Sequence, residues 1–282
     1  MTAREAYRYL KASFAPLGER EAEAEAREVL FSVCGLSASE LLLFPEKPIL
    51  AAQEQTLKAL CVRRTCGEPL AYLLGEREFY GLRFSVSEDV LIPRQETELL
   101  VERCTEIIQK ENLKTALDLC TGSGCIAVCL SRHTSAAISA SDISPEALSV
   151  ARKNAETLGA SVRFFESDLL KNVGGNYDLI VSNPPYISKE EYACIEPAVR
   201  EKEPALALLG GADGLLFYRR IAEDAPSHLN PGGHLALEIG YEQAKAVCAL
   251  LRAQGFDKIE VLKDYAGLDR MVFAIWNKAM GA

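Results

Sequence analysis

Residues 117–127 have the sequence LDLCTGSGCIA, in which an apolar run passes through two glycines into a second apolar run. This pattern predicts a buried strand that turns into a helix, because Gly122 and Gly124 allow a sharp turn and a close approach of a ligand to the backbone. The next predicted strand ends at Asp142, where a carboxylate can accept hydrogen bonds from ribose hydroxyls. The stretch therefore predicts a loop that binds a nucleoside cofactor.

The glycine loop by itself leaves two alternatives open. Residues 122–127 also satisfy the G-x-G-x-x-A pattern, so a nicotinamide cofactor must be considered. A tight strand-to-helix turn without any ligand is the other alternative, and the position of Asp142 makes it the less favoured one.

Strands and helices alternate on both sides of this loop. The hydrophobic periodicity predicts strands at 115–120, 137–142, 162–166, 177–182, 234–240, 256–262 and 270–276, and helices at 124–133, 145–158, 214–229 and 242–254. Repeated strand-then-helix steps predict an α/β fold with a doubly wound parallel sheet. The last two strands have no helix between them, which predicts a final antiparallel strand.

The N-terminal part is predicted to be helical. Residues 20–31, 37–44 and 53–64 contain strong helix formers or apolar residues at helical spacing, and either Ser37 or Ser39 can cap the second helix.

A short alternating stretch separates these helices from the sheet. Residues 78–86 alternate around a glycine and predict a β-hairpin, and a helix is predicted from Thr97 to Lys110. We therefore predict a helical substrate-recognition domain at 1–74, a linking β-hairpin at 75–92 and a catalytic α/β domain at 93–282.

Composition excludes several function classes. The 282 residues are 49% hydrophobic and 25% charged with a net charge of −9, which favours a globular protein without a general affinity for nucleic acid. No stretch has the length and apolarity of a membrane span, and the N-terminus shows no secretory signal. The nine cysteines form no C-x-x-C pair and the three histidines have no ligand-like spacing, so we expect no metal and no disulfides, and a location in the reducing cytoplasm.

Residues 181–186, VSNPPY, follow directly on a predicted buried strand. Two successive prolines fix φ near about −65° and offer no N–H, so the carbonyls of Asn183 and Pro184 can accept hydrogen bonds from a ligand. The Asn183 side chain adds an acceptor oxygen, and Tyr186 adds a flat face for stacking. This arrangement suits a planar group that carries an NH2. A turn that merely ends the strand is the alternative, since Asn-Pro favours turns.

The third predicted strand of the sheet ends at Asp168 and Leu169. Asp168 can accept from an adenine amino group while Leu169 packs on the ring, although a helix cap or turn is an equal alternative for the aspartate. Parallel strands would bring these residues to the same edge as the glycine loop, beside Asn183. A hydride enzyme would need a proton donor there, so transfer of a methyl group from a sulfonium to an NH2 fits better, with most of the rate gain coming from positioning and carbonyl dipoles.

The chain resembles the release-factor glutamine methyltransferases, the HemK/PrmC family, from about Glu68 to Phe273. The resemblance is carried by EPLAYLLGEREFYGLRFSVSEDVLIPRQETELLVE, LDLCTGSGCIAV, SDISPEALSVARKNA, SDLL, IVSNPPYI, EPALALLGGADGL, ALEIGYEQ and DYAGLDRMV. It implies a seven-stranded class I methyltransferase domain. It also implies an enzyme of translation termination that methylates the glutamine side-chain amide (N5) in the Gly-Gly-Gln motif of bacterial peptide chain release factors. We expect a monomer in the cytoplasm without direct contact to nucleic acid or membrane.

The resemblance also implies roles for individual residues. S-adenosylmethionine would be the cofactor, and Asn183 and Pro184 would be the catalytic pair that accepts from the glutamine amide. Pro185 and Tyr186 would shape the slot of the substrate. The cofactor would be held by Cys120, Thr121, Gly122, Ser123, Gly124, Asp142, Asp168, Leu169 and Asn183. The chain departs from the family pattern at Gln95, commonly proline, and at Cys120, often glycine.

Two other functions remain as alternatives. Asn-Pro-Pro-Tyr also resembles adenine-N6 nucleic-acid methyltransferases, whose acceptor is a flipped base, but the acidic charge and the lack of a basic insert between 186 and 240 weigh against that function. A non-enzymatic adaptor would be expected to have a broken glycine loop or a broken Asn-Pro-Pro, and both are intact. Arg94, Glu96 and Glu98 either contact cofactor or substrate or simply begin a helix.

Overall fold

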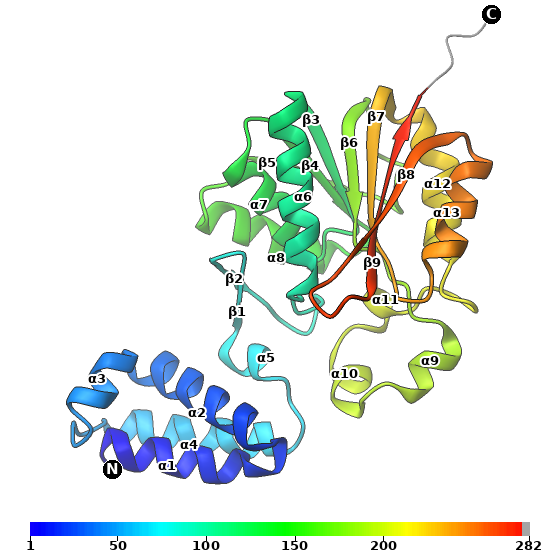
Figure 1. Cartoon of the computed structure of the whole chain (residues 1–282). Helices are drawn as coiled ribbons and strands as arrows, with labels where there is room; N and C mark the ends of the chain where they lie inside the picture. The colour runs from blue at the N-terminus through cyan, green and yellow to red at the C-terminus, as the bar shows by residue number, and fades with distance from the viewer. Residues whose placement is uncertain (278–282) are drawn as a thin grey trace, which may run out of the picture. The chain divides into compact units, whose positions relative to one another are not determined.

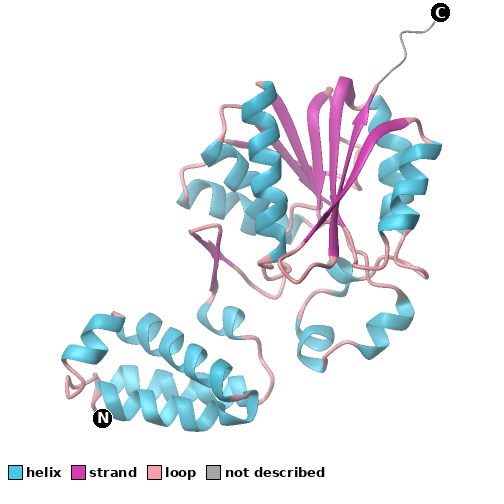
Figure 2. Cartoon of the chain, in the orientation of Figure 1, coloured by secondary structure: helices cyan, strands magenta, loops and turns pink. Residues whose placement is uncertain are grey.

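The computed structural model describes residues 1–277, and this part of the chain forms two compact units (Figures 1 and 2). The helical unit comprises Met1–Gly75 together with Pro197–Lys202. The sheet unit comprises Glu76–Glu196 and the described residues from Glu203 onward. The C-terminal limit of the predicted α/β domain, residue 282, lies outside the described residues.

The helical unit is held by apolar faces and capped helix ends. Its helices are α1 Ala3–Phe14, η1 Ala15–Leu17, α2 Glu19–Cys34, α3 Ala38–Leu43, α4 Ala51–Thr65, α5 Leu70–Leu74 and α10 Pro197–Lys202. Leu10, Leu30 and Leu57 are fully buried in one apolar cluster. Of the two predicted caps for α3, the structure selects Ser37, whose Oγ accepts from the backbone N–H of Glu40 at 3.1 Å.

Within residues 1–277, the sheet unit contains a seven-stranded sheet with the order β5-β4-β3-β6-β7-β9-β8. The strands are β3 Thr115–Leu119, β4 Ala137–Asp142, β5 Val162–Glu166, β6 Tyr177–Ser182, β7 Leu229–Glu238, β8 Phe256–Lys263 and β9 Asp269–Trp276. The first five strands of that order are parallel, and β9 lies antiparallel between β7 and β8. The predicted doubly wound α/β fold with an antiparallel final strand is confirmed.

Helices cover both faces of this sheet (Figure 1). One face carries α6 Glu96–Glu111, α7 Cys125–His133 and α8 Pro145–Thr157, and the other carries α12 Leu216–Asp224, η2 Ala225–Ser227 and α13 Ala244–Ala253. Successive side chains of β6 alternate between the two cores: Leu179 and Val181 pack on the first face and Ile180 on the second. No helix within residues 1–277 has the length and apolarity needed to cross a membrane.

The element bounds differ from the prediction where prolines and short elements occur. The helix predicted at 214–229 is shorter, since α12 ends before Pro226, and β7 begins at Leu229 rather than at 234. Two short helices of the sheet unit, α9 Lys189–Cys194 and α11 Ala205–Leu208, have too few residues for their periodicity to predict them.

A β-hairpin, β1 Glu76–Phe79 and β2 Leu82–Ser85, begins the sheet unit. Its turn residues Tyr80 and Gly81 both have positive φ, which matches the twist of a two-residue hairpin. Asn154 of α8 fixes the hairpin beside the glycine loop: its Nδ2 donates to the carbonyl of Ser85 at 3.0 Å and to that of Ser123 at 2.8 Å.

Candidate active site

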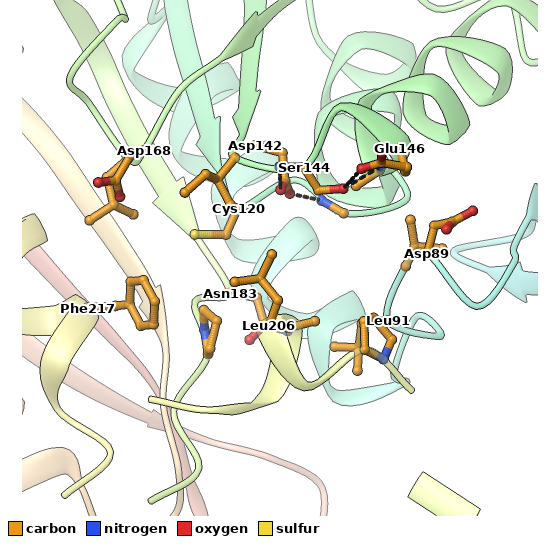
Figure 3. Close-up of a pocket in the computed structure, with 18 of the residues that line it drawn as sticks. Asp89, Leu91, Cys120, Asp142, Ser144, Glu146, Asp168, Asn183, Leu206 and Phe217 are labelled. Atoms are coloured by element: carbon orange, nitrogen blue, oxygen red, sulfur yellow. Dashed lines mark hydrogen bonds between the residues drawn. The ribbon is translucent and has the colours of Figure 1, made fainter. Parts of the chain in front are cut away.

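A cavity of about 470 Å³ lies at the carboxyl edge of the parallel strands (Figure 3). This volume is within the range of small-molecule sites. The residues that follow β3, β4, β5 and β6 line it: Cys120, Gly122, Asp142, Ile143, Ser144, Ser167, Asp168, Leu169, Asn183 and Pro185. The rest of the wall is formed by residues 88–91, by Glu146 and Ala147 of α8, by Pro204, Leu206 and Ala207, and by Phe217 and Arg220 of α12. Segments that are distant in the sequence thus meet at one site, as expected at a topological switch point.

The glycine loop presents backbone to this cavity. Cys120 and Gly122 have φ of 56° and 53°, and no atom lies within 4 Å of the position that a Cβ on Gly122 would take. A ligand can therefore approach the backbone closely at Gly122. Burial raises the pKa of the Cys120 thiol well above its ordinary value, so Cys120 lines the cavity as a neutral thiol.

The other residues of the loop hold its shape and do not line the cavity. The Oγ1 of Thr121 donates to Oδ2 of Asp118 at 2.6 Å, and the same oxygen accepts from the N–H of Ala127 at 3.2 Å. Asp118 is fully buried, and desolvation raises its pKa to about 7. Ser123 is buried and its carbonyl accepts from Asn154. Thr121 and Ser123 thus support the glycine loop rather than reach the cavity.

Gly124 allows α7 to pack closely on α8. Its φ is +81°, and a Cβ there would lie 3.0 Å from the Cβ of Ala151. We expect Gly124→Ala to lower the free energy of unfolding by about 2–4 kcal/mol, the sum of a left-handed backbone penalty and overpacking. Gly159→Ala is the matched control: φ is +62° but the nearest atom is a flexible Arg132 nitrogen at 3.5 Å, so only about 1–2 kcal/mol should be lost. Urea unfolding measures both, and equal losses would contradict the packing role.

Asp142 connects the glycine loop with the start of α8. Its Oδ2 accepts from the N–H of Gly122 at 2.9 Å, and its Oδ1 accepts from the N–H of Ser144 at 3.0 Å. Burial raises the pKa of this carboxyl. The N–H of Ile143 also acts on this carboxylate, and the two oxygens together have about four lone-pair directions, so Asp142 can still accept a hydrogen bond from a diol in the cavity.

Asp168 is held in an ion-pair network at the cavity wall. Its Oδ2 lies 2.7 Å from Lys171 Nζ and its Oδ1 lies 2.8 Å from Arg220 Nη2. The hydrogen bond from Lys171 is the main reason that the pKa of Asp168 is lowered, and Arg220 adds to it. The neighbouring Leu169 is buried, and with Phe217 it provides apolar surface for a flat ring.

Phe217 and Arg220 are lining residues that the sequence analysis missed. They lie one turn apart on α12, directly after the GGADGL segment, which carries part of the family resemblance. Their three-residue spacing places them on the same side of the helix, which was the available signal. It did not point to the cavity, because the packing of α12 beside the end of β5 is a tertiary contact.

Asn183 follows the last residue of β6 and lines the cavity. Its Nδ2 donates to the Oγ1 of Thr97 at 3.3 Å. Pro185 also lines the cavity, whereas Pro184 and Tyr186 are not among its lining residues. The carbonyl of Tyr186 accepts from Nε2 of Gln243 at 2.9 Å, which fixes the backbone after the two prolines. Burial raises the pKa of Tyr186 to about 12.

The outer wall is fixed by one ion pair. The Nη2 of Arg94 lies 2.5 Å from Oε1 of Glu203, a buried carboxylate whose Oε2 accepts from the N–H of Ile92 at 3.4 Å. Arg94 therefore holds residues 88–94 against the EPALALL segment. Glu98 has a structural partner as well, since its Oε1 accepts from the N–H of Tyr80 at 2.9 Å.

Comparison with known proteins identifies the family. The model of the methyltransferase small domain matches residues 95–212, and the PrmC N-terminal domain model matches residues 5–75. The release factor glutamine methyltransferase of Cereibacter sphaeroides is 43% identical over 277 residues, with 97% of this chain and 98% of the relative covered. The chain belongs to the release factor glutamine methyltransferase family. The Bacillus subtilis member is 42% identical, with 95% and 97% covered.

A more distant structural relative shows only the fold. The hMettl16 catalytic domain, solved with an RNA hairpin, is 18% identical and superimposes with a TM-score of 0.59 over 79% of this chain and 84% of that chain. As a member of the release factor glutamine methyltransferase family, the chain is a methyltransferase that uses S-adenosylmethionine. The cavity fits this cofactor, because it combines open backbone at Gly122, a carboxylate at Asp142 and the apolar surfaces of Leu169 and Phe217.

Proposed function

We propose that this chain methylates the side-chain amide nitrogen of the Gly-Gly-Gln glutamine in bacterial peptide chain release factors. The observation that carries the proposal is the placement of Asn183 at the cavity wall, with its Nδ2 end occupied by Thr97. The amide oxygen at the other end is then available as an acceptor. Family membership supports glutamine over adenine as the acceptor, since the relatives are named for glutamine in release factors.

The residues of this chain have distinct roles in the proposed reaction. S-adenosylmethionine supplies an electrophilic methyl group on a sulfonium. Cys120, Gly122, Asp142, Asp168 and Leu169 would hold it at the cavity wall, with Asn183 beside it, while Thr121, Ser123 and Gly124 would keep the loop in shape. The Asn183 side-chain oxygen and the Pro184 carbonyl accept the two N–H bonds of the glutamine amide, while Pro185 and Tyr186 shape its slot.

Positioning provides most of the rate gain in this proposal. The new N–C bond forms as the C–S bond breaks, and the nitrogen then releases one proton to solvent. The two carbonyl dipoles stabilise the positive charge that develops on the nitrogen, so no strong general base is required.

A labelled-methyl transfer assay tests the proposal. The chain and labelled S-adenosylmethionine are offered, in separate reactions, a bacterial release factor and adenine-rich duplex DNA. We expect label on the release factor, and none when its Gly-Gly-Gln glutamine is replaced by alanine. Label on DNA alone would contradict the release factor as the substrate, while the proposed methyl transfer at this site would remain supported.

The helical unit is our proposed surface for recognition of the protein substrate. None of the candidate site residues lies in this unit as the structure describes it, and the PrmC N-terminal domain model matches residues 5–75. We expect a chain that starts at Glu76 to bind S-adenosylmethionine with unchanged affinity and to show a KM for release factor raised at least about 10-fold, from loss of part of the interface. Cofactor binding reports that the shortened chain is folded, and an unchanged KM would contradict the role.

The partner also suggests where and how the enzyme works. We infer a monomer that acts in the cytoplasm, where its substrate is made. The nine cysteines are all free thiols, which suits a reducing compartment.

A further inference from the structure

Asn183 can perform the proposed task in only one orientation. Its amide has an oxygen that accepts and an NH2 that donates, and the two ends have nearly the same shape. A glutamine NH2 needs an acceptor, so the oxygen must face the cavity. If the Asn183 side chain were reversed, its NH2 group would face the NH2 group of the glutamine. Two hydrogen-bond donors would then face each other, and the glutamine amide would be repelled rather than held.

Two buried residues behind the cavity determine this orientation. The Oγ1 of Thr97 donates its single proton to Oε2 of Glu238 at 2.7 Å, so the same oxygen accepts from Nδ2 of Asn183 at 3.3 Å. A carboxylate can only accept, and it therefore sets the direction of both hydrogen bonds. The Asn183 side chain also lowers the pKa of Glu238 as a hydrogen-bonding group, which agrees with an NH2 end directed toward these two residues.

The fold places these groups together without their touching the cavity. Thr97 lies in the first turn of α6 and Glu238 ends β7, the strand beside β6. Their exposed fractions are 2% and 1%, and neither lines the cavity. Burying a carboxylate in a protein core is unfavourable, and an apolar residue of similar size would pack there at least as well. A carboxylate at this position therefore needs a reason other than stability.

We propose that Glu238 and Thr97 are positioning residues that keep the Asn183 side-chain oxygen directed toward the glutamine amide of the substrate. This inference rests on the proposed function, because only a substrate that presents an NH2 group for methylation requires that orientation. It adds two residues that touch neither cofactor nor substrate.

Ionisation of Glu238 makes the orientation sensitive to pH. Desolvation raises the pKa of Glu238 to about 7, while Thr97, Arg270 and Asn183 lower it and Glu96 adds to the rise. The other titratable groups that interact with it are Cys125, Tyr186 and Tyr218. Above about pH 7 the carboxylate accepts from Thr97. Below it, the neutral carboxyl can donate to Thr97, whose proton then turns toward Asn183 and favours the reversed amide.

Replacement of Thr97 by two residues of similar size tests the pair. Thr97→Val keeps the shape and removes the hydroxyl, and we expect kcat for release-factor methylation to fall about 10- to 100-fold with unchanged cofactor affinity. Thr97→Ser restores the hydroxyl and should recover kcat to within about 3-fold of the wild-type value. Wild-type kcat in Thr97→Val would overturn the inference, as would an equal loss in Thr97→Ser.

The pH profile provides a readout that a merely structural role would not change. Wild-type kcat should rise with a midpoint near pH 7, and both Glu238→Gln and Thr97→Val should lose this step. The side-chain NH2 resonance of Asn183, observed by nuclear magnetic resonance without any acceptor, should shift with the same midpoint in the wild type only. If the Asn183 resonance shifts with this midpoint but no methyl transfer to a release factor is detected, the proposed function is wrong while the positioning role of Thr97 and Glu238 is supported. A resonance that does not titrate would overturn the pair itself.

Discussion

Asn183→Ala is expected to lower kcat for methyl transfer about 1,000-fold while changing cofactor affinity by less than about 3-fold. The side-chain oxygen is one of the two acceptors proposed to hold the amide nitrogen in line, and loss of one oriented group of this kind costs about 100- to 1,000-fold elsewhere. The mutation also removes the Asn183 Nδ2 group that donates to Thr97. Both the oxygen that positions the glutamine amide and the hydrogen bond to Thr97 are therefore lost. Single-turnover methylation of a release factor at saturating cofactor measures the effect.

The matched control lies at the opposite end of the same strand. Asn176 precedes β6, is exposed, and donates through its Nδ2 to the carbonyls of Ser227 and Leu229 at 3.4 and 3.2 Å. Asn176→Ala removes the same amide far from the cavity and should leave kcat at the wild-type value. Wild-type turnover in Asn183→Ala would remove Asn183 from the mechanism, and equal losses in the two variants would indicate a general effect on β6.

The sequence predicted the parts of the site that belong to strand ends. Asp142, Leu169 and Asn183 each follow an apolar run whose period marks it as a strand, and parallel strands end at one edge of the sheet. Local chemistry therefore located these residues before any tertiary information was available. The same logic predicted the antiparallel final strand, because two strands without a helix between them cannot make a parallel crossover.

The parts that sequence did not predict depend on contacts between distant segments. The buried carboxylate of Glu203 pairs with Arg94 across more than 100 residues of chain, and no local pattern reveals such a pair. The link from Asn183 to Thr97 and Glu238 likewise joins three separate elements. Within the glycine loop, Thr121, Ser123 and Gly124 match the family motif, yet their side chains or Cβ position face the protein. A motif locates a loop, and packing decides which of its atoms reach the ligand.

Replacement of Asp142 should have the largest effect on cofactor binding. We expect Asp142→Ala to raise the Kd for S-adenosylmethionine about 100-fold, because charge-assisted hydrogen bonds contribute about 1.5–3 kcal/mol each and the ribose offers two hydroxyls. The N–H groups of Gly122 and Ser144 would also lose their acceptor. Isothermal titration calorimetry measures the change. Asp257→Ala, an exposed aspartate on β8 at the far edge of the sheet, is the control and should bind the cofactor as the wild type does.

The pH dependence of the Kd for S-adenosylmethionine distinguishes the contribution of the negative charge of Asp142 from that of its side-chain shape. Burial raises the pKa of Asp142, and the N–H groups of Ser144, Gly122 and Ile143 oppose that rise without cancelling it. The carboxylate that accepts from the ribose is therefore fully present above this raised pKa and is lost as pH falls through it, so the wild-type Kd should increase on acidification. Asp142→Asn has no proton to gain and should show a weaker affinity that does not follow this step. A wild-type Kd that stays constant while the Asp142 carboxyl titrates would mean that the cofactor does not bind through the charge of Asp142.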